Sequence, residues 1–255
     1  MRVTSRWLPG IVALALAGAP SCKGRGEAPP AAQGPRFPAE RIAVIGASVS
    51  AGFASPKLAS LLAEQLPDSA VGDFADLQMF RAPRRSGAEQ IEQARAFEPS
   101  AVFAVDFLFW YVYGSGMELE ERRAALAGGL TALDRLDAPV VVGDLPDVRG
   151  AAEWMIAPSA VPSAGELDAL NRELRAWAAA REQVIVVPLA AWVAQLRAGG
   201  EIAVPGHPPA DARELLSFDG VHATAKGMAY LLTQIGAVIR ERYPGTPPEL
   251  LDFVR

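Results

Sequence analysis

Short apolar runs alternate with helical patterns along most of the chain. Runs with little polar alternation are typical of strands buried on both faces of a sheet. Four such runs cover residues 41–46, 101–106, 139–144 and 183–188. A weaker pattern predicts a further strand at 77–80.

Apolar residues at helical spacing occupy the intervals between these runs. They predict helices with apolar positions at Leu58 to Leu66, 88–97, Leu119 to Leu133, Leu167 to Trp177 and Met228 to Ile239. Ser55 is expected to cap the first helix, with Pro56 at its first position. Ser163 and Glu166 form a capping-box pattern ahead of the fourth.

This alternation predicts βαβ units with right-handed crossovers, and therefore an α/β fold with three layers around a mainly parallel sheet. In such folds the ligand crevice lies beyond the carboxyl ends of the strands. The predicted domain covers residues 41–255. Residues 23–40 contain frequent Gly and Pro and no apolar period, which predicts a flexible linker.

The first 22 residues have the parts of an export signal. Arg2 and Arg6 precede an apolar run at 11–19, and small residues precede Cys22. The run is about half of the roughly 20 residues that span a bilayer. We therefore expect export to the periplasm or beyond the cell. The position of Cys22 resembles a bacterial lipoprotein signal, which would anchor the protein to a membrane; an ordinary signal with an incidental cysteine is the alternative.

Composition narrows the range of functions. With 255 residues, 51% of them hydrophobic, the chain can form one large domain or two small ones. The net charge is −5 and acidic residues are spread along the chain, so we do not expect nucleic acid as a partner. One cysteine excludes an internal disulfide, and two histidines leave few ligands for zinc. We expect no metal and no cofactor.

A serine follows the first predicted strand at a position suited to chemistry. Ser48 lies two residues after Gly46, which permits a tight turn and close approach of a substrate. Backbone N–H groups near Ser48 would then face the crevice, where they could hold an oxyanion. The alternative is a turn serine that caps the next helix, and Ser50 could serve that purpose too. The glycine patterns for dinucleotide and phosphate binding do not occur.

Asp219 and His222 form a second candidate group, just ahead of the last predicted helix. Their separation on a turn allows the carboxylate to bind one imidazole nitrogen and leave the other to accept a proton from a hydroxyl. Serine needs such a base, because its hydroxyl is a weak nucleophile at neutral pH. The alternative is a surface histidine in a turn that Thr224 caps.

The two segments together resemble the SGNH (GDSL-like) hydrolase family. Gly-Ala-Ser-Val-Ser-Ala-Gly-Phe at 46–53 is similar to the family's first block, and residues 219–227 are similar to its last block. The resemblance implies a flavodoxin-like sheet and ester hydrolysis through an acyl-enzyme, with no cofactor. It implies Ser48 as nucleophile, His222 as base and Asp219 as the residue that orients the base.

The resemblance also implies an oxyanion hole and marks two departures from the family. The N–H groups of Ser48 and Gly87 would hold the oxyanion, with Gly87 opening a helix; Gly72 is the competing assignment. Ala47 replaces an aspartate of the first block. Where the family has an asparagine that donates to the oxyanion, this chain has Asp106, which cannot donate when ionised. Its alternative role is to end a strand and cap a loop.

The sequence allows more than one role for several side chains and more than one function for the protein. The aromatic residues between 107 and 113 could wall an acyl pocket or pack in the core. His207 and Asn171 are expected to be structural. Besides an esterase acting on a small-molecule, lipid or acylated-sugar ester, the same residues would serve an acyltransferase. The missing asparagine supports a third possibility, a binding protein that has lost turnover.

Overall fold

The computed structural model describes residues 34–204 and 206–254. The predicted export signal at 1–22, including Cys22, and residues 23–33 of the predicted linker lie outside the described residues.

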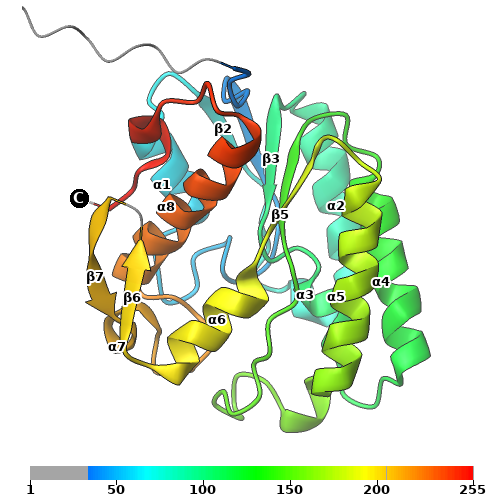
Figure 1. The fold of residues 1–255 in the computed structure, drawn as a ribbon. Coiled ribbons are helices and arrows are strands. Elements are labelled where there is room, and N and C mark those ends of the chain that lie inside the picture. The colour runs from blue at the N-terminus through cyan, green and yellow to red at the C-terminus, as the bar shows by residue number, and fades with distance from the viewer. Residues whose placement is uncertain (1–33, 205, 255) are drawn as a thin grey trace, which may run out of the picture. The chain divides into compact units, whose positions relative to one another are not determined.

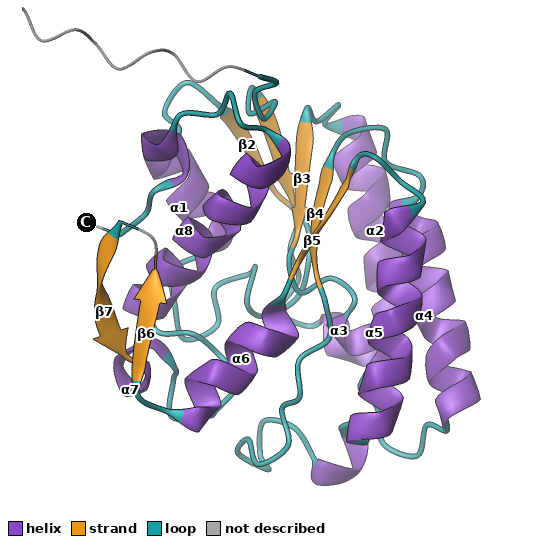
Figure 2. Cartoon of the chain, viewed as in Figure 1, coloured by secondary structure: helices purple, strands orange, loops and turns teal. Residues whose placement is uncertain are grey.

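A five-stranded parallel sheet forms the centre of the described domain (Figures 1 and 2). The strands are β1 (Arg41–Val44), β2 (Ala70–Asp73), β3 (Ala101–Ala104), β4 (Val140–Gly143) and β5 (Val184–Val187). Their order is β2-β1-β3-β4-β5. This is the flavodoxin-like order, which reverses between β1 and β3 and opens a crevice at the carboxyl ends of these strands. The predicted fold class is confirmed.

Helices cover both faces of the sheet (Figure 2). One layer consists of α2 (Pro83–Ala96), α4 (Leu119–Leu133) and α5 (Ala164–Ala179), and the other contains α1 (Leu58–Gln65), α6 (Leu189–Ala198) and α8 (Ala225–Arg242). Side chains alternate between the faces of a strand. Ala43 and Ile45 of the first strand segment therefore pack with α2, α4 and α5, whereas Ile42 and Val44 pack with α1 and α8.

Smaller elements complete the domain. They are the helices α3 (Phe109–Val112) and α7 (Ala212–Leu215), the antiparallel strands β6 (Glu201–Val204) and β7 (His207–Asp211), and the 3-10 turns η1 (Met79–Arg81), η2 (Pro158–Ala160) and η3 (Pro248–Leu251). The two antiparallel strands and α7 form a separate small core with Tyr230 of α8.

The strand predictions are confirmed at the four apolar runs and wrong at the weaker one. Residues 77 and 78 form a turn and residues 79 and 80 belong to η1, so the edge strand is β2 instead. In β2, Ala70 and Asp73 are exposed. An edge strand of this kind buries too little apolar surface to produce a recognisable run.

The predicted helices are present, but the N-cap of α1 and the first residue of α2 differ from the prediction. The capping box of Ser163 and Glu166 is present at α5. Helix α1 begins at Leu58 with Lys57 as its N-cap, so Ser55 does not cap it. Helix α2 begins at Pro83 and not at residue 88, with the proline in the first turn, where no backbone donor is lost.

The N-terminal boundary of the domain lies before the predicted residue 41. Phe37 is buried, and its N–H donates to the Thr246 hydroxyl at 2.9 Å. Its ring packs edge-on against Phe103 and Tyr243. Burial of a phenylalanine side chain stabilises a fold by about 1.5–3 kcal/mol. Residues 37–40 therefore belong to the domain and not to the linker.

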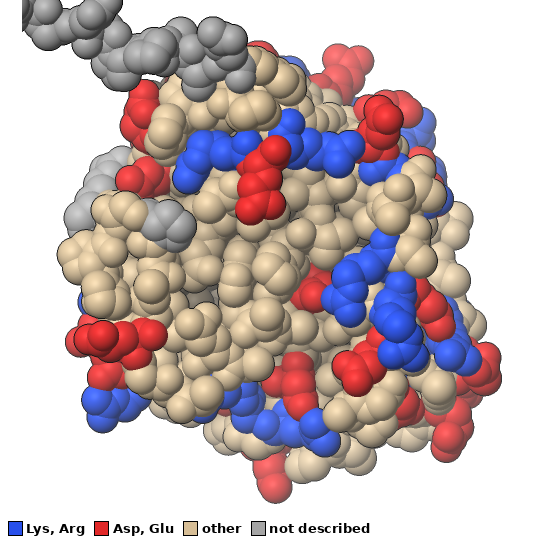
Figure 3. Space-filling model, viewed as in Figure 1, with Lys and Arg blue, Asp and Glu red and all other residues tan. Residues whose placement is uncertain are grey.

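The surface carries mixed charge on the face that Figure 3 shows. Basic and acidic side chains lie next to each other around a broad uncharged area. In the described part of the chain, no helix is long and apolar enough to cross a membrane.

Candidate active site

The loop after β1 is held in a conformation that only glycine permits. Gly46 has φ +145°, and a Cβ atom there would lie 2.2 Å from the Asp106 carboxylate. The Gln90 side chain of α2 bonds to both sides of this residue, accepting from the Gly46 N–H at 2.7 Å and donating to its carbonyl at 3.0 Å. These contacts fix the start of the loop that carries Ser48.

Asp106 lies in the turn two residues after β3 and binds the rest of this loop. Its Oδ1 accepts from the Ala47 N–H at 3.1 Å and the Ser50 hydroxyl at 2.6 Å, and its Oδ2 accepts from the Val49 N–H at 2.8 Å and the Ser50 N–H at 3.4 Å. Asp106 is buried, at 7% exposure. Asp106 therefore caps a loop, as the alternative interpretation of the sequence proposed, although β3 already ends at Ala104. The capped loop contains Ser48.

Asp219 and His222 lie in the turn before α8. The Thr224 hydroxyl caps that helix by accepting from the Gly227 N–H at 3.0 Å. Asp219 Oδ1 accepts from the N–H groups of Val221 and His222, both at 2.9 Å, and its Oδ2 lies 2.7 Å from His222 Nδ1. The capping role of Thr224 and the pairing of the two side chains therefore occur together in one turn.

The hydrogen bonds to Asp219 keep its carboxylate ionised. Burial by itself would raise the pKa of this carboxyl, but the bonds from the His222 and Val221 N–H groups and from the imidazole outweigh it and lower the pKa. An ionised carboxylate only accepts hydrogen bonds, so His222 Nδ1 carries the proton. The other ring nitrogen is then free to accept a proton.

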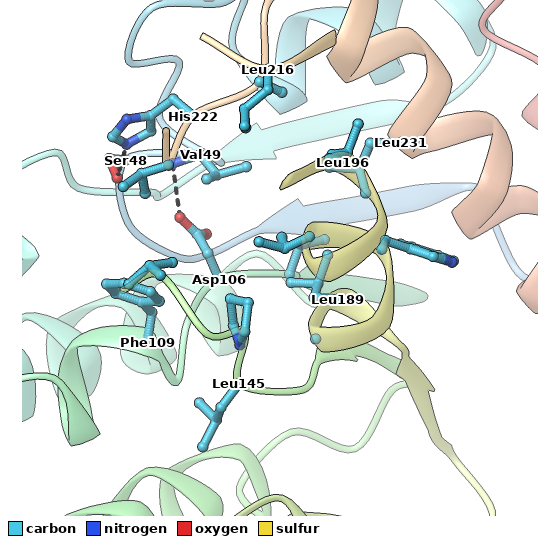
Figure 4. Close-up of a pocket in the computed structure, with 18 of the residues that line it drawn as sticks. Ser48, Val49, Asp106, Phe109, Leu145, Leu189, Leu196, Leu216, His222 and Leu231 are labelled. Atoms are coloured by element: carbon cyan, nitrogen blue, oxygen red, sulfur yellow. Dashed lines mark hydrogen bonds between the residues drawn. The ribbon is translucent and has the colours of Figure 1, made fainter. Parts of the chain in front are cut away.

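Ser48 completes this arrangement. His222 Nε2 lies 2.7 Å from Ser48 Oγ, although the two residues are 174 positions apart in the sequence (Figure 4). The fold thus brings the three predicted residues into one line of hydrogen bonds from carboxylate through imidazole to hydroxyl. This geometry lets the imidazole remove the hydroxyl proton as the oxygen attacks a substrate.

An apolar pocket of about 100 Å³ opens beside Ser48 (Figure 4). Its walls include Leu189, Trp192, Val193 and Leu196 of α6, Leu231 of α8, and Leu145, Val148, Met155 and Ile156 from the loops that follow β4. The predicted aromatic cluster divides between two roles. Phe109 and Trp110 line the pocket, whereas Phe107, Tyr111 and Tyr113 are buried in the core.

Comparison with solved structures finds similar folds. A lipase/acylhydrolase from Enterococcus faecalis superposes with a TM-score of 0.56 over 82% of this chain and 98% of its own, at 18% identity. A protein from Bacteroides fragilis assigned as an acylhydrolase gives 0.51 over 82% and 91%, at 15% identity. TesA gives 0.50 over 79% and 99%, at 19% identity. The chain has an SGNH hydrolase fold. No family model and no curated protein sequence matches it.

Within this SGNH hydrolase fold, one predicted oxyanion donor is available and another is not. In the described residues, the Ser48 N–H has no acceptor, so it is free to bind a substrate oxygen. Gly87 does not open α2 but is its fifth residue, beyond the first turn, whose N–H groups alone are free. A Cβ atom there would lie 2.1 Å from the Tyr111 hydroxyl, so close packing explains this glycine.

Gly72, the alternative candidate for an oxyanion donor, and the remaining polar residues have structural roles. Gly72 pairs with Ala43 inside the sheet. Asn171 bonds to the backbone N–H and carbonyl of Leu145, at 2.8 and 2.9 Å. His207 Nε2 lies 2.7 Å from the Asp252 carboxylate. Across the residues that the structure describes, no group of three or more His, Cys, Asp or Glu side chains could hold a metal ion.

Sequence reasoning missed two contributors to the site. Gln90 contacts Gly46 across 44 positions, and no local pattern signals such a contact. Helix α6 supplies a wall of the pocket, and its apolar residues at 189, 192, 193 and 196 follow helical spacing. That spacing was available in the sequence and would have predicted the helix.

Proposed function

We propose that this protein hydrolyses carboxylic esters through an acyl-enzyme intermediate. Ser48 is the nucleophile, His222 the general base and Asp219 the residue that orients the imidazole. The observation that carries the proposal is the pair of 2.7 Å contacts that join Asp219, His222 and Ser48. The SGNH hydrolase fold supports it, because a lipase/acylhydrolase and a protein assigned as an acylhydrolase are similar to this chain in fold.

The reaction follows from the donors and acceptors of the site. His222 Nε2 takes the proton of Ser48 as Oγ attacks the ester carbonyl carbon, and the Ser48 N–H donates to the resulting oxyanion. His222 then returns the proton to the leaving alcohol. Water, activated by His222, releases the acid from the acyl-enzyme. Asp219 stays ionised throughout and stabilises the imidazolium.

The acyl group of the ester would occupy the apolar pocket beside Ser48. The pocket wall consists largely of leucine, valine and aromatic side chains, which favour a hydrocarbon chain over a sugar. An alcohol that replaced water in the second step would make the protein an acyltransferase with the same residues. The absence of an asparagine donor to the oxyanion favours slow turnover, because loss of one donor typically costs about 100-fold to 1,000-fold.

Export is part of the proposal. Its support is the sequence of the first 22 residues, with two arginines, a short apolar run and small residues before Cys22. A mature N-terminus at or before Cys22, found by mass spectrometry of protein from its native host, would agree with it.

The test of hydrolysis uses nitrophenyl esters from acetyl to palmitoyl. Ser48→Ala and His222→Ala should each lower kcat/KM by at least about 10⁴-fold, and the double variant should be about as slow as either, because the two residues act as one proton-transfer unit. Ser55→Ala is the matched control. Its hydroxyl reaches only the Phe53 carbonyl at 3.4 Å, so its activity should be unchanged.

Two results would count against the proposal. Wild-type turnover by Ser48→Ala with an unchanged circular dichroism spectrum would exclude Ser48 as the nucleophile. A wild-type protein that bound long-chain fatty acid but hydrolysed none of the esters would favour a binding protein.

A further inference from the structure

The large apolar side chains that are exposed in the described part of the chain lie near the candidate active site. They are Phe53, Leu77, Phe80, Trp154 and Phe218, and their exposure ranges from 37% to 89%. Exposure of large apolar side chains to water is unfavourable, so a group of them marks a surface that contacts an apolar partner. We call these five residues the apolar rim.

Two ring contacts join the apolar rim to the candidate active site, and a third contact joins two members of the rim. The Phe53 ring lies 4.6 Å from the imidazole of His222, centroid to centroid. The Phe80 ring lies 5.8 Å from Trp110, which lines the pocket.

The third contact is between the rings of Trp154 and Phe218, whose centroids lie 6.0 Å apart. Phe218 directly precedes Asp219, and the two residues after Trp154 line the pocket. Leu77 lies in the same region, because the N–H of neighbouring Asp76 donates to the Gly46 carbonyl at 3.0 Å. The apolar rim therefore lies at the end of the sheet where Ser48 lies.

The charges on one side of the rim favour an anionic partner. Arg81 and Arg84 are exposed and have no ion-pair partner among the described residues, and the Arg81 guanidinium lies 5.7 Å from the Phe80 ring centroid. The adjacent Arg85 differs, because it pairs with Glu89 at 2.8 Å. Against the two free arginines stand Asp76 and, next to Trp154, the exposed Glu153. On the Phe80 side of the rim the two arginines exceed Asp76 by one charge, whereas Glu153 lies on the Trp154 side. Basic charge beside the exposed Phe80 ring suits a surface of anionic headgroups.

We propose that the apolar rim docks this protein on a lipid bilayer that contains anionic headgroups. Aromatic side chains would enter the interface and Arg81 and Arg84 would contact the headgroups. The choice of a bilayer over other apolar partners rests on the proposed function. Exposing an acyl chain to water costs about 0.8 kcal/mol per CH₂ group. A chain that passes from a bilayer through the apolar rim into the apolar pocket avoids this cost.

Vesicle binding tests the proposal without any catalysis. The full-length protein is mixed with vesicles of phosphatidylcholine alone or with a third of phosphatidylglycerol, and bound protein is measured by co-sedimentation. Binding should be stronger with phosphatidylglycerol. The double variant Trp154→Ala/Phe218→Ala should bind at least about tenfold more weakly to both, because two exposed rings no longer enter the interface.

Matched variants separate the contributions. Trp154→Phe keeps an apolar ring and should bind like the wild type. Arg81→Ala/Arg84→Ala should lose the preference for phosphatidylglycerol. Arg172 is an exposed arginine on α5 with no ion pair among the described residues, so Arg172→Ala should keep the preference. The side chains replaced in these variants are all exposed, so the variants should fold, and circular dichroism checks this.

Three results would overturn the proposal. They are no binding to either vesicle, equal binding by the wild type and the Trp154→Ala/Phe218→Ala variant, and a wild-type dimer in analytical ultracentrifugation that this variant abolishes. The last result would assign the rim to a second copy of the chain. Ser48→Ala should bind vesicles like the wild type, so failure of docking and failure of the hydrolase proposal are distinguishable.

Discussion

Replacing Asp106 by asparagine tests how the loop of Ser48 is held. The carboxylate accepts three backbone N–H groups and one hydroxyl, two at each oxygen. An asparagine has one acceptor oxygen and one NH₂ group. If the oxygen stays at the Oδ1 position, the NH₂ group faces the donors of Val49 and Ser50. If the amide is flipped, the Ala47 N–H loses its acceptor.

Either orientation leaves at least one buried donor without a partner. Each such donor costs about 1–3 kcal/mol, and bonds to a charged group are the stronger ones, so Asp106→Asn should lower the free energy of unfolding by about 2–4 kcal/mol. Urea unfolding followed by circular dichroism measures this loss. Activity should fall with it, because Ser48 lies between Ala47 and Val49 and moves with them.

Ser50→Ala provides the comparison, since it removes only the hydroxyl donor at 2.6 Å. It should cost about 1 kcal/mol. The two changes share a contact, so the double variant should lose less than the sum of the single losses. A loss below about 1 kcal/mol for Asp106→Asn, with full esterase activity, would refute the clamping role of this carboxylate.

Two further predictions concern Asp219 and the pocket. The folded protein holds the pKa of Asp219 below its ordinary value of 3.8, so the stability that its contacts supply is present above about pH 4 and is lost as the pH falls through the lowered pKa. The difference in unfolding free energy between the wild type and Asp219→Asn should therefore narrow below about pH 4; a constant difference from pH 3 to 7 would contradict this. Leu196→Trp should fill the pocket and lower kcat/KM for octanoyl and longer esters at least about tenfold more than for acetyl esters, whereas Ala194→Trp on the exposed side of α6 should not. An unchanged chain-length preference in Leu196→Trp would place the acyl group elsewhere.

The fold was predictable because its central strands are buried on both faces. Residues 41–46, 101–106, 139–144 and 183–188 are continuous apolar runs, and continuous runs separated by helices have few alternatives to a parallel sheet. The edge strand at Ala70–Asp73 was not found, because a strand that is exposed at both ends carries no such run. Register and strand order depend on contacts between distant segments, which periodicity does not record.

The sequence predicted the two turns that carry the candidate site residues, but not the contacts between distant segments that hold the site together. Ser48 follows a strand after a glycine, and Asp219 precedes His222 at a spacing that allows their contact. That His222 reaches Ser48 was an expectation from the family resemblance, and their catalytic roles stay a prediction. Gln90 and Asp106 contact the loop across 44 to 59 positions, and such contacts leave no local pattern. Gly87 was misassigned because a glycine needed for close packing in a helix has the same sequence pattern as one at a helix start.

A serine-directed fluorophosphonate probe tests the central claim most directly. The probe should label the native protein once, and peptide mass spectrometry should find the adduct on Ser48. His222→Ala should react far more slowly, because no base activates the hydroxyl. Labelling should also be absent after acid unfolding, since the nucleophile depends on the folded contacts. An adduct on Ser50 or no adduct on a folded wild-type protein would contradict the assignment of Ser48 as the activated nucleophile.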